Sequence, residues 1–145
     1  MKFLQSRFED YISANEKYNL HSELEGIYNK KDMGLQQKRN LIFYGPSGVG
    51  KYTQVLKYIQ PYSDSNLKYE RKIKFNFQNK REFLIKISDI HFEIDMELLG
   101  CNAKLLWNDI YNHILDILSA RQNHTGIIVC KNFHKIHSEL LDIFY

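Results

Sequence analysis

The chain has 145 residues, of which 43% are apolar and 26% are charged, a globular balance that excludes disordered and collagen-like classes. This length favours a single domain, and no run of about 18 apolar residues is present to predict a membrane-spanning helix. The net charge is +3, and the two cysteines are too few for a disulfide framework, so we expect a reduced, intracellular protein.

The first part of the chain is predicted to be helical. Apolar residues recur at helical spacing in residues 3–14 and again in residues 20–28, with a polar separator at 15–19. Residues 30–40 are polar and predict a loop. The continuous apolar run at 41–44 then predicts a short strand buried on both faces.

The middle of the chain combines a helix with alternating strands. Residues 51–60 predict a helix that Pro61 ends. The apolar period then changes to two in residues 72–78 and 82–88, and Asn79-Lys80 between them predicts a hairpin turn. A third alternation, at residues 90–94, predicts another strand.

The last part returns to helical spacing. Residues 103–118 carry the clearest apolar stripe, the run at 127–129 predicts a buried strand, and a final helix is expected from residue 136. This alternation predicts an α/β fold: a parallel sheet flanked by helices, with an inserted antiparallel hairpin. We divide the chain into an N-terminal helical segment, residues 1–40, and a partial nucleotide-binding domain, residues 41–145.

Positive charge is concentrated on the predicted hairpin. Residues 68–86 hold seven basic and two acidic side chains, a balance of +5, whereas the remainder has 13 basic and 15 acidic residues, a balance of −2. A solvated strand face protected by lysines explains this pattern most simply. The alternative is a contact surface for phosphate or for an acidic partner.

The segment Gly45–Lys51 has the sequence GPSGVGK and fits the phosphate-binding P-loop, between a predicted strand and a predicted helix. Glycines let the backbone wrap closely around a phosphate, and the helix N-terminus directs N–H groups towards it. The Lys51 ammonium adds a full positive charge.

Two departures weaken the chemistry that usually accompanies this loop. The position after the lysine should hold Ser or Thr to bind Mg²⁺, but Tyr52 stands there and Thr53 follows. A strand ending in two acids should support the metal and polarise water. The strand at 127–129 instead leads into Cys130 and Lys131, which predicts phosphate binding without hydrolysis.

The sequence LIFYGPSGVGKYTQ, residues 41–54, resembles the P-loop of the small subunits of replication factor C, the clamp loader, within the AAA+ ATPases. The segment IHFEIDMELLG, residues 90–100, resembles the strand of this family with a His-hydrophobe-Glu core. The resemblance covers about two thirds of the chain. The sequence as a whole also resembles clamp-loader proteins of large DNA viruses.

The resemblance implies an AAA+ core that binds ATP and leaves the role of Mg²⁺ open. The residues that it assigns to the nucleotide phosphates are Gly45, Pro46, Ser47, Gly48, Val49, Gly50, Lys51, Tyr52 and Thr53. It implies other clamp-loader subunits, a sliding clamp and primer–template DNA as partners, no membrane, and a site of DNA replication in the nucleus or the cytoplasm. We expect a truncated core without the lid and collar of the family, and we assign neither catalytic residues nor metal ligands.

Two further functions remain open at this point. One is an active ATPase in which a remote acid such as Asp142 supplies catalysis; the other is an interaction module that no longer binds nucleotide. A zinc site at Cys130, His134 and His137 is disfavoured because no fourth ligand is evident. Three residues before the P-loop could contact adenine or, equally, pack a helix pair: Tyr18, Leu20 and His21.

Overall fold

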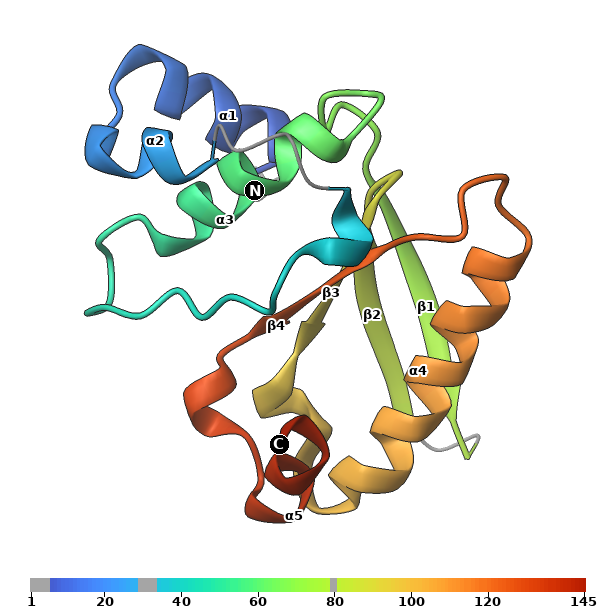
Figure 1. Cartoon of the computed structure of the whole chain (residues 1–145). Helices are drawn as coiled ribbons and strands as arrows, with labels where there is room; N and C mark the ends of the chain where they lie inside the picture. Colours follow the sequence, from blue (N-terminus) through green and yellow to red (C-terminus); the bar gives the residue numbers. More distant parts are fainter. Residues whose placement is uncertain (1–5, 29–33, 79–80) are drawn as a thin grey trace, which may run out of the picture. The chain divides into compact units, whose positions relative to one another are not determined.

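The computed structural model describes residues 6–28, 34–78 and 81–145 of the chain (Figure 1). The chain forms two compact units, Met1–Glu70 and Arg71–Tyr145, although its length alone favoured one domain. The boundary expected after residue 40 falls inside the first unit. Among the described residues, none of the helices combines the length and the apolar character that crossing a bilayer requires.

The first unit is helical. Its main helices are α1 (Phe8–Lys17), α2 (Glu25–Tyr28) and α3 (Lys51–Ile59), and three single 3-10 turns accompany them at Ser22–Leu24, Leu35–Gln37 and Gln60–Tyr62. The α1 helix begins where the Arg7 N–H donates to the Asp10 carboxylate, 2.6 Å away, which supplies an acceptor for the helix N-terminus. The core of this unit includes the fully buried side chains of Phe8, Leu56 and Leu67.

Two helix predictions in this unit needed correction. The helix expected at 3–14 begins at Phe8 and extends to Lys17, because Asn15 in the supposed separator is buried and shares a hydrogen bond with α3. Residues 3–5 of the expected helix lie outside the described residues. The stripe at 20–28 forms only short helices and leaves Leu20 and Ile27 more than half exposed. The helix expected at 51–60 is confirmed as α3, and Pro61 lies in the 3-10 turn that follows it.

The buried strand expected at Leu41–Tyr44 is wrong. These residues form no strand, and the side chains of Ile42 and Tyr44 are 85% and 96% exposed. A strand needs neighbouring strands to satisfy its backbone N–H and C=O groups, and an apolar run does not specify which strand that is.

The second unit is a mixed sheet with helices. Its strands are β1 (Arg71–Phe77), β2 (Arg81–Ile87), β3 (His91–Asp95) and β4 (Ile127–Lys131), and its helices are α4 (Ala103–Ser119) and α5 (Ser138–Leu141). The sheet order is β1-β2-β3-β4. The first two pairings are antiparallel and β3–β4 is parallel, so the predicted parallel sheet is corrected to a mostly antiparallel one in a mixed α/β fold.

The predicted hairpin is confirmed as β1 and β2, with Ile73 opposite Ile85 and Phe75 opposite Phe83. The turn predicted at Asn79-Lys80 lies outside the described residues. Lys72 and Lys74 are exposed on one face of this hairpin, and the Lys74 ammonium lies 2.7 Å from the Glu82 carboxylate. The exposed face agrees with the solvated-face interpretation, and the phosphate-contact alternative stays a prediction.

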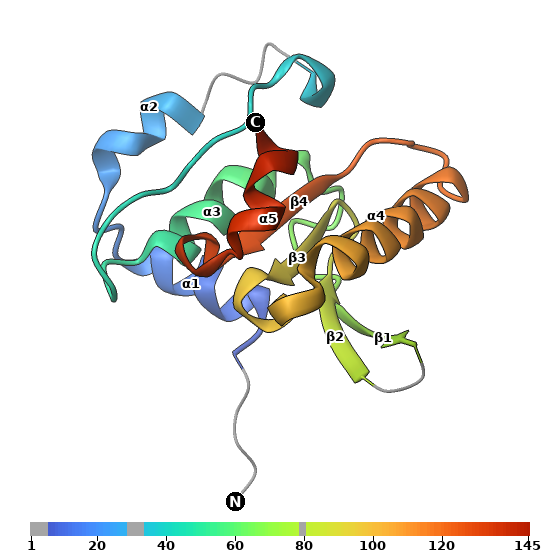
Figure 2. The same ribbon diagram turned by 90° about the horizontal axis from the view of Figure 1, so that it is seen from below.

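The long helix α4 lies against the sheet and supplies much of the core of this unit (Figures 1 and 2). The predicted stripe is confirmed, since Leu106, Trp107, Ile110 and Ile114 are all buried. The strand β4 was expected to be buried on both faces, but every residue in it is half-buried. The reason is that, among the described strands, β4 is the last of the sheet and has a neighbour only on the side of β3.

Candidate functional site: the phosphate loop

The phosphate loop, which consists of Gly45–Gly50, follows the segment at 41–44 and leads into the first residue of α3, Lys51. Gly48 and Gly50 have φ angles of 78° and 85°, in the left-handed region that L-residues with a Cβ adopt at a cost. The glycines at these two positions therefore match a conformational requirement of the loop. Gly50 is also the residue that caps the N-terminus of α3.

The side chain of Lys51 is turned back onto the beginning of the loop. Its ammonium donates to the carbonyl oxygen of Gly45, 2.6 Å away, and to that of Pro46. The positive charge that the sequence assigned to phosphate binding thus lies on the loop itself. An ammonium carries three donors, so it can hold these carbonyls and still donate to an anion beside them.

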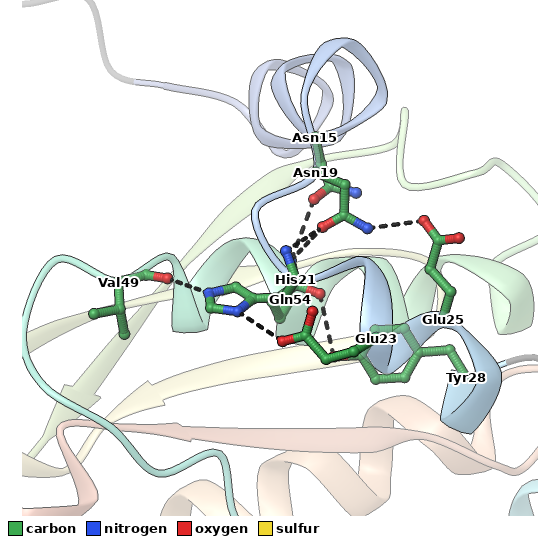
Figure 3. A network of polar contacts seen from close by, with 8 residues as sticks. All are labelled: Asn15, Asn19, His21, Glu23, Glu25, Tyr28, Val49 and Gln54. Atoms are coloured by element: carbon green, nitrogen blue, oxygen red, sulfur yellow. Dashed lines mark hydrogen bonds and ion pairs between the residues drawn. The ribbon is translucent and has the colours of Figure 1, made fainter.

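His21 contacts the loop from the chain segment between α1 and α2 (Figure 3). One ring nitrogen, Nε2, lies 2.7 Å from the carbonyl oxygen of Val49, and the other, Nδ1, lies 3.3 Å from the Glu23 carboxylate. The hydrogen bond to Val49 and the bond to Glu23 together raise the pKa of His21. The pKa of Glu23 is lowered, chiefly by a hydrogen bond from its own backbone and also by His21.

A buried amide beside this contact joins the first three helices (Figure 3). The Gln54 side chain is 4% exposed; its Nε2 donates to the side-chain oxygens of Asn15 and Asn19 at 3.3 and 3.1 Å. Its Oε1 accepts from the Tyr28 hydroxyl at 3.2 Å. Asn19 in turn accepts the backbone N–H of His21, so this network holds His21 in place beside the loop.

The two residues after Lys51 do not restore the missing hydroxyl ligand. The Tyr52 ring packs edge-to-face on Tyr11 of α1, with ring centroids 4.8 Å apart, and Thr53 is half-buried on α3. Residues of a helix are separated by about 100° around its axis, so Thr53 faces a different direction from the expected Ser or Thr at position 52.

Of the three residues that were expected to contact adenine or pack helices, the structure gives His21 a contact with the loop. Tyr18 and Leu20 are 75% and 65% exposed, which contradicts the helix-packing interpretation for both. Contact with adenine stays a prediction. Sequence reasoning selected His21 but missed its Val49 partner, because no local pattern links residues 28 positions apart.

Cys130 and Lys131 lie in β4, in the second unit, opposite Ile94 and Asp95 of β3. Burial raises the pKa of the Cys130 thiol to about 11, so it stays protonated at neutral pH. The Lys131 ammonium lies 4.0 Å from the Glu93 carboxylate. These two positions hold a neutral thiol and a cation, so neither supplies the acid that a metal-supporting strand end would need.

Ser88, His91 and Glu93 form a second polar cluster, with the residue types of a hydrolase triad. The Ser88 Oγ accepts the backbone N–H groups of Ile90 and His91, so its own hydrogen is left for His91 Nδ1, 2.5 Å away. The His91 proton is then on Nε2, facing Glu93 at 3.3 Å. All three side chains are buried, so this cluster shapes the turn between β2 and β3 rather than meeting a substrate.

Cys130, His134 and His137, which were considered as zinc ligands and disfavoured, do not form a metal site. Across residues 6–28, 34–78 and 81–145, no three His, Cys, Asp or Glu side chains gather as a metal site would require. His137 instead accepts the Glu139 backbone N–H at the beginning of α5.

No protein-family model matches the chain, and a search of curated proteins finds no match either.

Proposed function

We propose that this chain binds the phosphates of ATP through Gly45–Thr53 and hydrolyses it weakly or not at all. The observation that carries the proposal is the Lys51 ammonium, which is held on the carbonyls at the start of the loop. Gly48 and Gly50 of this loop have left-handed φ angles, and the loop leads into a helix N-terminus. Backbone N–H groups and the helix dipole favour an anion at such a position. Lys51 would donate to the β- and γ-phosphate oxygens.

The weak hydrolysis follows from the residues that stand at the other positions of the motif. Tyr52 lacks the short hydroxyl that binds Mg²⁺, and Cys130 and Lys131 can neither support a metal nor act as a general base at neutral pH. The expected binding is therefore nearly independent of Mg²⁺. The resemblance to clamp-loader subunits supports a role in DNA replication beside other subunits, a sliding clamp and primer–template DNA.

Titration calorimetry of ATP against the wild type and two lysine variants tests this function. Lys51→Ala should weaken binding roughly tenfold or more, because a hydrogen bond to a charged group contributes about 1.5–3 kcal/mol. Lys57→Ala, which removes a second lysine from α3 outside the loop, is the matched control and should bind as the wild type does.

A parallel assay of phosphate release separates the alternatives. Binding without turnover supports the proposal, whereas steady turnover would favour an ATPase with a remote acid. Absence of ATP binding by the wild type would refute the proposal and favour an interaction module. Equal affinities for Lys51→Ala and the wild type would refute the assignment of the loop.

A further inference from the structure

The contacts of His21 require a particular protonation state. Its Nε2 faces the Val49 carbonyl oxygen at 2.7 Å and its Nδ1 faces the Glu23 carboxylate at 3.3 Å, and both of these groups are acceptors. A neutral imidazole has one N–H and can serve one of them. The imidazolium has two N–H groups and serves both, so the charged ring is the form that this geometry fits.

The acidic groups near the ring favour the same form. Glu23 on the neighbouring 3-10 turn is the direct partner, and Glu25 at the start of α2 accepts from the Asn19 amide at 2.8 Å, next to the His21 backbone. On the loop side, Lys51 turns its ammonium to the carbonyls of Gly45 and Pro46. The pKa of His21 is raised as a result of its bonds to Val49 and Glu23.

The hydrogen bond between His21 and Val49 also bears on the direction of the neighbouring Gly50 N–H. In a trans peptide the carbonyl of one residue and the N–H of the next point in opposite directions within one plane. Because His21 holds the Val49 oxygen, it also fixes the direction of the Gly50 N–H, which points the opposite way. Gly50 itself has a φ of 85° and no Cβ, so its own conformation restrains this peptide little.

We propose that protonated His21 is a positioning residue of the phosphate loop, so that the affinity of the loop for a nucleotide phosphate depends on the protonation of His21. This inference rests on the proposed function. The imidazolium fixes the Val49–Gly50 peptide and adds a positive charge beside the loop. Because the pKa of His21 lies above its ordinary value of about 6.5, the ring is charged at low pH, and the effect is lost as the pH rises through the raised pKa.

The test is ATP affinity from about pH 5.5 to about pH 8.5, a range that spans the histidine titration, for the wild type, His21→Gln and His21→Ala. Comparison at each pH removes the titration of ATP itself. Wild-type affinity should fall by roughly two- to tenfold relative to His21→Gln across this range, the size of one net hydrogen bond. His21→Gln retains a permanent N–H donor and should give a flat ratio to His21→Ala.

Two acid variants test the charge on the ring directly. Glu23→Gln should lower the pKa of His21, measured from its ring proton resonances without ligand, and move the affinity profile to lower pH. Glu16→Gln removes an exposed acid from α1 and should leave both unchanged. The Gly50 amide resonance should follow the His21 titration in the wild type.

The failures are distinguishable. If the wild type binds ATP but its profile coincides with that of His21→Ala at every pH, the positioning role is refuted and the proposed function stands. If the wild type binds no ATP at any pH, the proposed function is refuted and this inference with it.

Discussion

Replacing Gln54 by Leu should destabilise the first unit by about 2–4 kcal/mol. Leu has a similar volume, so the change removes three hydrogen bonds without opening a large cavity. Asn19 keeps the His21 N–H as a donor, but Asn15 and the Tyr28 hydroxyl are both buried and lose a partner. Each such loss costs about 1–3 kcal/mol, and burial of the Leu methyl groups offsets part of the sum.

The assay must report on the first unit, because the single tryptophan, Trp107, lies in the second. Hydrogen exchange of the amides in α1 and α3 gives the free energy of opening for these helices. Gln36→Leu, at an exposed position, is the matched control and should change exchange little. Tyr28→Phe should also cost less in the Gln54→Leu background than in the wild type, because its partner is already absent. Unchanged exchange in Gln54→Leu would refute the view that this amide holds the three helices together.

Two further changes test single residues. Gly50→Ala should weaken ATP binding and lower the free energy of unfolding in urea by about 1–2 kcal/mol, because an added Cβ is strained at a φ of 85°. Gly34→Ala, at a φ of −56° in open space, is the control. Equal effects of the two substitutions would contradict the strain argument. Alkylation at about pH 8, with both sites mapped by mass spectrometry, should modify the exposed Cys101 first. Burial raises the pKa of Cys130 from 9.0 to about 11, which leaves its thiolate fraction roughly a hundredfold lower. Faster reaction at Cys130 would refute its buried, protonated state.

Sequence patterns predicted those parts of the fold whose signal is local. The apolar stripe of α4 extends over several helical turns, and the alternation in β1 and β2 extends over the length of each strand. All three elements are present. The strand at 41–44 failed because four apolar residues carry no information about a pairing partner. The sheet direction failed for the same reason, since β2–β3 and β3–β4 pair in opposite senses.

The candidate site divides in the same way. The phosphate loop is contiguous, and its glycines were found because each backbone requirement is met by a single residue type. The contacts that hold it are between segments. Gln54, a polar residue at a position that is buried in α3, was the available signal for a network, but its partners Asn15 and Tyr28 could not be read from spacing.

The strand order of the second unit has a consequence for how its sheet can assemble. The order β1-β2-β3-β4 follows the chain, so each strand joins one that is already in place. The first two additions pair consecutive strands antiparallel, and the third brings α4 along as it closes the parallel pair. Arg121, after α4, then binds the carbonyl oxygen of Asp89 in the β2–β3 turn at 2.7 Å. Contacts between near neighbours in sequence close small loops at low entropic cost, so we expect the antiparallel pairs to form first and the parallel pairing of His91 with Ile127, across α4, to be the slow step.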